Sequence, residues 1–532
     1  MMNSEILWEA PDNWCWTTIS EIGDVVAGGT PSSKEPKYWG EDINWISPSD
    51  LTGYSKKTIR KGKKSITNEG LKNSSAKVMP SGSIHFSSRA PIGYVVISAE
   101  SLATNQGFKS LVPAPGIFNE YVYYYLKASK QIAEKRASGT TFLELSGNAF
   151  GRLPLPIPPL NEQKRIVAKI EELFSELDNG IAALKTAREQ LKVYRQAILK
   201  HAFEGKLTAK WREANADKLE TPEQLLSRIQ KERDARYQQQ LNDWKTAIKE
   251  WEAKSKEGKK PVKPRQHQYD IKFSSNEIAT FPELPANWVW VPLNELISGL
   301  PRAMQSGPFG SNLKHSEFTA SGKLVIGIDN VKDGYFSIGS ENRISEEKFA
   351  ELKKYEARPG DLLITVMASL GRTCVIPRDI EQAIITKHVY RISMEQHLLH
   401  PEFYNYLLQS HTISRLSMFE SAQGQTRLGL NSTILKELPV PLCDITEQKK
   451  IVEYIEKNLS SLSRFECEID SALKRSETLR QSILKKAFSG QLVPQDLTDE
   501  PAKELLTRIK LKNERQKLPN KKQQPNVAVN SY

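Results

Sequence analysis

The sequence predicts an α+β protein with an internal pseudo-twofold repeat: two similar globular modules separated by two long antiparallel coiled-coil helices. Residues 153–207 recur without a gap as residues 438–492, and roughly 40% of the aligned positions are identical, far above chance for an ungapped segment. Each copy carries the apolar periodicity of a long helix. In residues 1–152, before the first copy, short β-like runs alternate with turn signals and no βαβ rhythm is present, which favours mainly antiparallel sheets. The residues before the second copy repeat several motifs of this first module.

The ends of the two long helices are marked by matching signals. A proline-rich lead-in at residues 154–159 holds the chain extended before the first helix. The expected N-caps, first-turn glutamates and C-terminal glycines form three pairs: Asn161 and Thr446, Glu162 and Glu447, Gly205 and Gly490. A helix of about 43 residues would be on the order of 60 Å long.

The apolar positions of the two helices are expected to form a coiled-coil seam, because they recur near every 3.5 residues. The seam positions are Ile170, Leu177, Leu184, Leu191 and Ile198 in the first helix and Ile455, Leu462, Ile469 and Ile483 in the second. Leu173, Ile181, Tyr194, Leu459, Leu473 and Leu479 extend the same pattern. Gly180 weakens the first seam by about 1 kcal/mol. The alternative is a pair of unrelated surface helices, each buried against its own domain.

Composition sets limits on the class of protein. The 532 residues carry a formal net charge of +12, which favours a polyanionic partner without establishing one. The four cysteines are scattered, with no CxxC pair, which indicates a reducing compartment and neither a disulfide frame nor a zinc site. No secretion signal or membrane-length apolar run is present. We therefore expect a soluble, cytoplasmic protein.

Repeated motifs suggest the domain boundaries. Pro-Asp-Asn-Trp at residues 11–14 returns as Pro-Ala-Asn-Trp at 285–288, and LLSRI at 225–229 returns as LLTRI at 505–509. A module helix is expected at 119–137. The expected segments are a first module (1–152), a long helix for spacing and partner docking (153–211), a charged helical insertion and linker (212–279), a second module (280–437), a second long helix (438–494), and a short helix with a basic tail (495–532).

The insertion carries a solvated helix, expected at 222–256, and a basic run at 254–265. This run could contact phosphates, but charged linkers are common, so an inert linker is the competing interpretation. The sparse Leu, Ile and Trp residues of the insertion also suggest that it lengthens a partner-docking bundle.

The sequence lacks the motifs of an active site. It contains no GxxxxGK phosphate loop, no GxGxxG after a strand, no Asn-Pro-Pro-aromatic stretch of the kind an amino-methyltransferase uses, and no nuclease constellation. His397 and His400 have metal-like spacing, but we find no carboxylate or cysteine next to them and predict no metal site. No catalytic residue is therefore assigned, and a binding protein is favoured.

A basic protein with two modules on long helices suits an extended polyanion, and DNA is the natural candidate. Lysine and arginine would contact phosphates, while arginine, lysine, amide and hydroxyl side chains would read base edges. In the first module the candidates are Lys34, Lys37, Ser47, Asp50, Lys56, Lys57, Arg60, Lys61, Lys63, Lys64, Arg89, Thr140 and Thr141. In the second they are Arg302, Gln305, Ser306, Ser311, Asn312, Lys314, Asn330, Lys332, Arg372, Lys387, Gln425 and Arg427. A solvated turn is the competing interpretation of residues 56–64.

The repeated motifs resemble those of one protein family. NEQKRIV and TEQKKIV open the long helices, ILKHAFEGKL and ILKKAFSGQL close them, and the modules contain GGTPS, INWISPSDL and SGPFG. This order resembles the specificity subunit of Type I restriction-modification systems. The resemblance covers essentially the whole chain, although the insertion is longer than a minimal subunit needs.

The resemblance implies that two target-recognition domains each read half of a split, asymmetric DNA site, with the helices as spacer. It also implies two modification subunits that methylate adenine N6 with S-adenosylmethionine, and restriction subunits that use ATP and Mg. This chain would bind none of these cofactors itself. Two other classes remain open: a fused methyltransferase or nuclease, and a coiled-coil scaffold that does not read DNA sequence.

Overall fold

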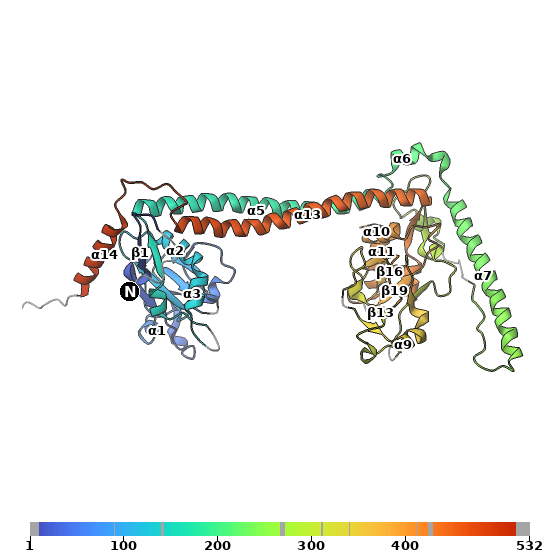
Figure 1. The fold of residues 1–532 in the computed structure, drawn as a ribbon, viewed down its shortest axis with the longest axis horizontal. Helices are drawn as coiled ribbons and strands as arrows, with labels where there is room; N and C mark the ends of the chain where they lie inside the picture. The colour runs from blue at the N-terminus through green and yellow to red at the C-terminus, as the bar shows by residue number, and fades with distance from the viewer. Residues whose placement is uncertain are drawn as a thin grey trace, which may run out of the picture. The chain divides into compact units, whose positions relative to one another are not determined.

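The computed structural model describes residues 10–89, 91–139, 143–266, 272–309, 312–339, 341–410, 412–423 and 429–517. The chain divides into two compact units: Met1–Lys185 with Asp470–Tyr532, and Thr186–Ile469. Each unit therefore combines a globular module with parts of both long helices (Figure 1). Among the described helices, none combines the length and the apolar character that a membrane crossing requires.

The first unit contains one module, the beginning of one long helix, the end of the other, and a short helix (Figure 1). Its strands are β1 (Cys15–Thr18), β2 (Gly23–Ala27), β3 (Trp39–Ile46), β4 (Thr58–Ile59), β5 (Ser65–Ile66), β6 (Ile84–Ser87), β7 (Val95–Ser98), β8 (Ala103–Thr104), β9 (Phe108–Pro113) and β10 (Pro154–Ile157). Its helices are α1 (Asn68–Lys72), α2 (Asn119–Ala128), α3 (Lys130–Arg136), α4 (Gly147–Gly151) and α14 (Ala502–Lys517). The single helix expected at 119–137 is thus two helices.

The second unit repeats this plan and adds the insertion. Its strands are β11 (Val289–Pro292), β12 (Met304–Ser306), β13 (Lys323–Ile326), β14 (Arg343–Ile344), β15 (Glu356–Ala357), β16 (Leu362–Thr365), β17 (Thr373–Val375), β18 (Ala383–Ile385), β19 (Val389–Ile392) and β20 (Pro439–Leu442). Its helices are α6 (Ala209–Ala214), α7 (Pro222–Ala253), α8 (Ser275–Ile278), α9 (Glu346–Glu351), α10 (Pro401–Gln409), α11 (Ile413–Gln423) and α12 (Ser432–Lys436). The long helices α5 (Leu160–Phe203) and α13 (Ile445–Phe488) each run from one unit into the other.

The sheets of the two modules share a strand order, with one additional edge strand in each module: β4 in the first and β15 in the second. The first module has the order β2-β9-β6-β7-β4 in one sheet and β5-β3-β8 in another. The second has β12-β19-β16-β17 and β14-β13-β18-β15. Pairing is antiparallel except in β3 with β8, β4 with β7, and β13 with β18. The predicted α+β class with two similar modules is confirmed.

A separate antiparallel pair closes each module just before its long helix. In the first module β1 pairs with β10, so the proline-rich lead-in forms a strand against the segment that follows Pro-Asp-Asn-Trp. In the second module β11 pairs with β20 in the same way. The start and end of each module are therefore fastened together where the long helix begins.

The core of the first unit is completed by the far end of the second long helix. Phe488 of α13 is buried and lies edge-to-face against Tyr121 and Tyr125 of α2, with ring centroids 5.4 and 5.1 Å apart. Ile166 and Ile170, from the start of α5, join the same cluster. Burying one large aromatic side chain contributes about 2–3 kcal/mol.

The core of the second unit is completed in the same way by the end of the first long helix. Phe203 of α5 packs edge-to-face on Phe403 of α10 with a centroid distance of 5.1 Å. Ile451 and Ile455, from the start of α13, lie in the same buried cluster. Each module thus holds the beginning of one long helix and the end of the other.

The two helix segments within a unit run antiparallel. In the first unit Asp178 bonds Arg480, whereas Asn161, nearer the start of α5, bonds Asp499, which lies beyond the end of α13. All nine predicted seam positions are buried or half-buried. Tyr194 and Leu479, which we expected to extend the pattern, are instead about half exposed, at 54% and 51%.

The beginnings of the two long helices differ from the sequence prediction. In α5, Asn161 is not the N-cap, because the helix already starts at Leu160. The same holds for α13. Thr446 is not the N-cap, because the helix already starts at Ile445. Asp444 lies before it, and its carboxylate accepts a 2.6 Å hydrogen bond from the Thr446 backbone N–H. An acidic residue at this place also suits the positive end of the helix dipole.

Candidate nucleic-acid interface

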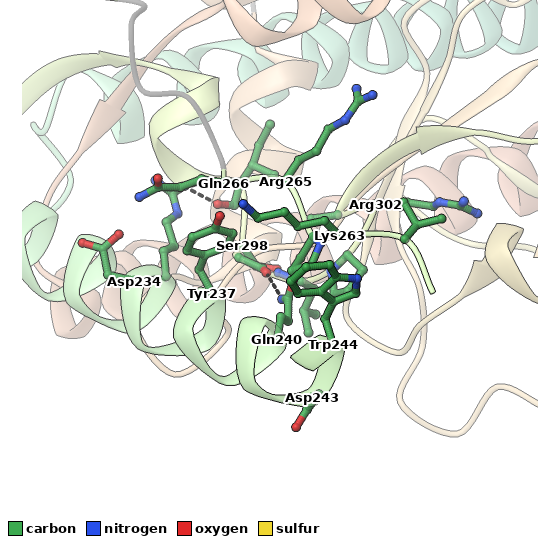
Figure 2. A pocket seen from close by; sticks show the side chains of 18 of the residues that line it. Asp234, Tyr237, Gln240, Asp243, Trp244, Lys263, Arg265, Gln266, Ser298 and Arg302 are labelled. Carbon is green, nitrogen blue, oxygen red and sulfur yellow. Dashed lines mark hydrogen bonds between the residues drawn. The ribbon is translucent and has the colours of Figure 1, made fainter. Parts of the chain in front are cut away.

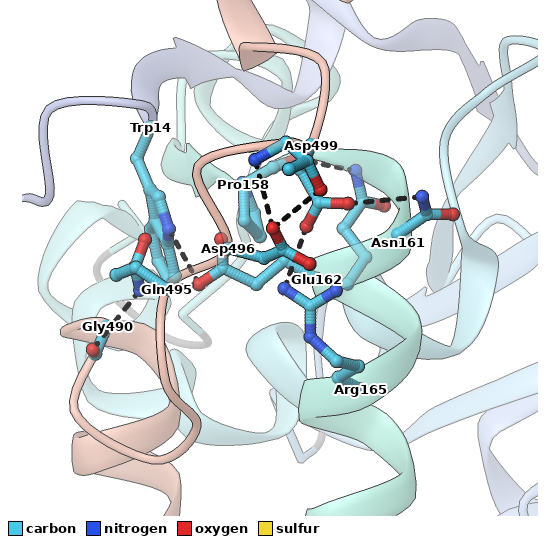
Figure 3. A network of polar contacts seen from close by, with 11 residues as sticks. Trp14, Pro158, Asn161, Glu162, Arg165, Gly490, Gln495, Asp496 and Asp499 are labelled. Carbon is cyan, nitrogen blue, oxygen red and sulfur yellow. Dashed lines mark hydrogen bonds and ion pairs between the residues drawn. The ribbon is translucent and has the colours of Figure 1, made fainter.

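Each module is fixed to its long helix by one buried glutamate. Glu162, in the first turn of α5, accepts hydrogen bonds from Trp14 Nε1 at 3.0 Å and Gln495 Nε2 at 2.6 Å (Figure 3). Burial raises the pKa of this carboxyl, and the two hydrogen bonds oppose that shift. Asp499, from the same segment after α13, bonds Asn161 at 3.1 Å and Arg165 at 2.7 Å.

The second unit repeats the arrangement with other donors. Glu447 accepts from Trp288 Nε1 at 3.0 Å, from Thr208 Oγ1 at 2.7 Å and from Arg212 Nε at 2.8 Å. Thr208 and Arg212 follow the end of α5, as Gln495 follows the end of α13. The Pro-x-Asn-Trp motif therefore supplies an indole donor to a helix start in both units.

The glutamine after each glutamate orients the module's own helix. Gln163 Oε1 accepts from the Phe118 backbone N–H at 2.9 Å, just before α2, and Gln163 Nε2 donates to Pro158 O at 3.0 Å. Gln448 Oε1 accepts from the His400 N–H at 2.9 Å, just before α10, and Gln448 Nε2 donates to Cys443 O at 2.8 Å. The glutamine of each repeated Glu-Gln pair thus fixes the position of the module's own helix relative to the start of the long helix.

Each module has a glycine that packs directly against the backbone of a neighbouring segment. Gly28 follows β2 in the first module, and Gly307 follows β12 in the second. A Cβ added at Gly28 would overlap the backbone of Asn105, and one added at Gly307 would overlap Ile385 and Thr386. In the first module Asn105 Nδ2 also donates to Thr30 Oγ1 at 2.6 Å. The two modules therefore share this backbone construction, although the side chains around it differ.

The first module carries a basic cleft of about 420 Å³ with an aromatic wall. Lys61, Lys63 and Lys64 line it together with Trp39, and Lys64 Nζ lies 5.3 Å from the Trp39 ring. Trp39 is itself fixed by a 3.1 Å bond from Nε1 to Ser32 O. Lysines beside an aromatic face suit a phosphate backbone with exposed bases or sugars.

The other first-module candidates divide into free and engaged side chains. Exposed positions are Lys34, Lys37, Lys56, Arg60, Lys61, Lys63 and Lys64. Lys37 pairs with Glu69 at 2.6 Å, Arg60 with Glu100 at 2.6 Å, and half-buried Arg89 with Glu144 at 3.6 Å. Thr140 and Thr141 lie outside the described residues. The structure thus brings Lys61, Lys63 and Lys64 together.

The second-module candidates are more dispersed. Arg302, Asn312, Lys314 and Lys387 are exposed, and Gln305, Lys332 and Arg372 are half-buried. Arg302 has a left-handed backbone with φ of 54° and lines a cleft of about 1010 Å³ (Figure 2). Ser311, Gln425 and Arg427 lie outside the described residues.

Several candidates have roles inside the fold. Asn330 is 1% exposed, and its amide bonds the backbone of Gly327, Ser337 and Ile338. Ser306 is also buried. The hydrogen bonds of Asn330 show that it supports its loop, and Ser306 is a buried residue of strand β12. A buried side chain cannot meet a base edge without rearrangement, so base reading by these two residues stays a prediction.

Three further first-module candidates, Ser47, Asp50 and Lys57, also make contacts within the fold. The Asp50 carboxylate accepts from the backbone N–H and Oγ of Ser47, both at 2.8 Å, so both residues are held in a turn. Lys57 lies between Glu120 at 2.9 Å and Glu171 at 2.5 Å. These contacts give the three side chains a structural role, and their assignment as DNA contacts stays a prediction.

Sequence reasoning missed Trp39 and Asn105. Trp39 is the first residue of β3. Tryptophan is common in strands, so nothing in the sequence indicated that this one lines a cleft. Asn105 lies in the Thr-Asn-Gln stretch that echoes Thr-Lys-His at 386–388, and that echo could have identified it.

His397 does have carboxylate neighbours, contrary to our sequence-based premise. Its Nε2 lies 2.5 Å from Glu232 Oε1, and Glu395 is close enough to share a cation with both. Glu395 is already paired with Arg236 at 3.0 Å and accepts from the Gly299 N–H at 3.2 Å. These hydrogen bonds and ion pairs explain why Glu232, Glu395 and His397 lie together: they hold α7 against the second module.

The two modules share one backbone frame, carry different surface side chains and are each fixed to both long helices. This combination defines a duplicated recognition protein. The family described as "Type I restriction modification DNA specificity domain" matches residues 11–186 and 311–475. The chain belongs to this family, a DNA-recognition family without catalytic activity of its own, so the predicted resemblance is confirmed.

Individual relatives agree with the family. The MjaIX specificity subunit of Methanocaldococcus jannaschii is 37% identical over 195 residues, covering 36% of this chain and 44% of the relative. The EcoBI specificity subunit of Escherichia coli is 26% identical over 439 residues, covering 79% of each chain.

Solved structures show the same fold. A chain from work on assembly and conformational transition of the type I R-M system has a TM-score of 0.61 at 18% identity, covering 91% of this chain and 100% of that one. The HsdS subunit from Thermoanaerobacter tengcongensis gives 0.53 at 17% identity, covering 92% and 99%.

Proposed function

We propose that each module reads one half of a bipartite, asymmetric DNA sequence and that α5 and α13 set the distance between the halves. One observation carries this proposal. Both modules have the same glycine-loop construction, at Gly28 and at Gly307, while the side chains around the two loops differ. A common frame gives both modules one docking geometry on the duplex, while different side chains select different bases.

The chain would act as the specificity subunit of a larger assembly in the cytoplasm. Two modification subunits would methylate adenine N6 with S-adenosylmethionine, and restriction subunits would supply ATP- and Mg-dependent cleavage. The long helices would dock the modification subunits as well as set the spacing. The four cysteines, all free, suit a reducing compartment.

In the first module, the cleft of Lys61, Lys63, Lys64 and Trp39 is the proposed backbone contact. Phosphate contacts by lysine set the register of the module without carrying sequence information. The expected effect of neutralising these lysines is weaker binding to all sequences, with a less steep dependence on salt.

Module exchange tests the proposal. The chain is assembled with its modification subunits, and methylated adenines are mapped before and after residues 1–152 are replaced by the first module of a relative. One half of the recognised sequence should change while the other half and the spacing stay constant. A change in both halves would refute independent reading.

The competing function is a coiled-coil scaffold that does not read DNA sequence. It predicts that methylation by the partners is equally frequent at all sequences with or without this chain. Comparing methylation maps with and without the chain separates the two functions directly.

A further inference from the structure

The insertion forms a helix with an extended strap folded back along it. After α7 ends at Ala253, the backbone reverses through left-handed conformations at Ser255, Lys256 and Gly258, with φ of 55°, 64° and 83°. We call residues 254–265 the basic strap. Because Ser255 and Lys256 are not glycines, this reversal costs on the order of 1–3 kcal/mol per residue and needs support from its surroundings.

Two tryptophans of α7 give that support. Trp251 Nε1 donates to Gly258 O at 3.2 Å, and Trp244 Nε1 donates to Pro261 O at 3.1 Å. Lys260 Nζ lies 5.8 Å from the Trp251 ring, and Lys263 Nζ lies 6.0 Å from the Trp244 ring. Seven residues separate the tryptophans, so both lie on one face of the helix.

The strap is therefore held in one conformation. Pro261 and Pro264 fix their own φ and keep the residues before them, Lys260 and Lys263, extended. Holding the strap in place before binding reduces the entropy lost when it meets a partner.

The strap concentrates positive charge without neutralising it. Its six cations, all exposed, are Lys254, Lys256, Lys259, Lys260, Lys263 and Arg265. Glu257 is the single acidic residue in this stretch. Within the described ranges, no ion pair joins any of the six to a carboxylate, in contrast to Lys37, Lys57 and Arg60 of the first module.

The strap is anchored to the second module through α7. Arg236 of the helix pairs with Glu395 at 3.0 Å, and Gln240 Nε2 donates to Gly299 O at 3.1 Å. Lys263 and Arg265 line the same cleft of about 1010 Å³ as Arg302, a candidate DNA contact (Figure 2). Two cations of the strap thus lie in one cleft with a candidate DNA contact of the second module, a cleft that Asp234 and Asp243 also line.

From this arrangement we propose that the basic strap is a sequence-independent contact to the phosphate backbone of double-stranded DNA beside the half-site read by the second module. The inference rests on the proposed function, which places DNA on that module. A row of exposed cations on a fixed extended segment matches a regularly charged strand, and lysine is suited to phosphate as a point charge.

The test uses the full chain assembled with its modification subunits. In the strap variant, Lys256, Lys259, Lys260, Lys263 and Arg265 are replaced by Gln. The matched control replaces the same four lysines by Arg, which keeps the charge. Binding is measured against salt concentration on a cognate duplex, on an unrelated duplex, and on a cognate duplex shortened on the side of the second half-site.

The strap variant should bind both full-length duplexes at least about tenfold more weakly at 0.1 M salt, because each lost phosphate contact removes about 0.9 from the salt slope. The Lys-to-Arg control should bind like the natural chain. Shortening the duplex should weaken the natural chain and leave the strap variant unaffected. The methylated sequence should stay the same in all variants.

Unchanged affinity and salt slope in the strap variant would overturn the inference, as would a loss confined to the cognate duplex. Failure of the strap variant to assemble with the modification subunits would also overturn it and identify the strap as a protein-docking element. If the natural assembly shows no sequence preference in methylation, the proposed function fails instead, whatever the strap does.

Discussion

Trp14 donates a hydrogen bond of 3.0 Å from its indole nitrogen to the buried carboxylate of Glu162, 148 residues later in the chain. Trp288 makes a bond of the same length to Glu447. Each bond joins the first strand region of a module to the first turn of a long helix. The orientation of a module on its helix therefore depends on a contact that involves no DNA.

Replacing Trp14 by Phe should destabilise the first unit by about 1.5–3 kcal/mol, because a buried carboxylate loses a donor. Trp288→Phe should cost less, since Glu447 keeps Thr208 and Arg212 as donors. Hydrogen exchange in α2 and in α10 measures the two effects separately. Equal protection of α2 in the Trp14→Phe variant and the natural chain would contradict the assigned role.

The glycines that end the long helices should not tolerate a side chain. Gly205 and Gly490 have φ of 68° and 72°, and an added Cβ would overlap Pro285 and Pro11 respectively. Alanine at either place should cost at least about 1 kcal/mol from the left-handed backbone alone. Thermal unfolding of the two single variants checks this.

Gly180 provides the matched control for the glycine variants. It lies inside α5, and nothing approaches within 4 Å of an added Cβ. Alanine there should stabilise the protein by about 0.5–1 kcal/mol, because helix propensity rises without a clash. A destabilising Gly180→Ala substitution would indicate that the seam needs a break at this position.

The first module should lose stability in acid because of His85. Its ring is fully buried, Nδ1 lies 2.9 Å from Ser110 Oγ, and burial lowers its pKa to about 3. A lowered pKa means that the folded state binds the proton less well than the unfolded state. The contribution to stability is therefore complete above about pH 6.5 and falls between there and pH 3, by up to about 1.4 kcal/mol per pH unit.

A His85→Gln variant should show a shallower decline in unfolding free energy from pH 7 to pH 5. Glu162, whose raised pKa gives a contribution that is lost as pH rises, is present in both proteins, so it cancels in the comparison. Denaturant unfolding at several pH values, with hydrogen exchange in β6 as the local probe, measures the difference. Parallel pH profiles would rule out His85 as the source.

Lys57 and Lys61 should behave oppositely although both belong to the same basic run. Lys57→Gln removes the partner of Glu120 and Glu171 and should cost about 1 kcal/mol of stability with little change in the salt slope of DNA binding. Lys61→Gln should leave stability unchanged and lower DNA affinity. Paired unfolding and binding measurements distinguish the roles. Loss of affinity without loss of stability at Lys57 would support it as a DNA contact.

The repeat, the helices and the α+β class could be predicted because they depend on local periodicity and on comparison of the chain with itself. The candidate site was less accessible for a physical reason. A lysine in a basic run looks the same whether it faces solvent, like Lys61, or a pair of glutamates, like Lys57. Glu171 lies on α5, far along the chain, so only the tertiary fold reveals the difference.

Polar side chains on loops were ambiguous in the same way. Asn330 is a polar residue in a loop region, as a base-reading residue would be. Its side-chain amide is nevertheless hydrogen-bonded to three backbone groups. Trp39 has the residue type of a core position, yet it lines an open basic cleft.

The exchange of helix ends between the modules indicates how such a chain could arise. Ile198, Leu199, Ala202 and Phe203 fill the second core, and Ile483, Leu484, Ala487 and Phe488 fill the first at the matching places of the repeat. A half-length ancestor with one module and one helix could therefore form a homodimer in which each copy lends its helix end to the other. Tandem gene fusion would then free the two halves to acquire separate specificities while retaining one architecture.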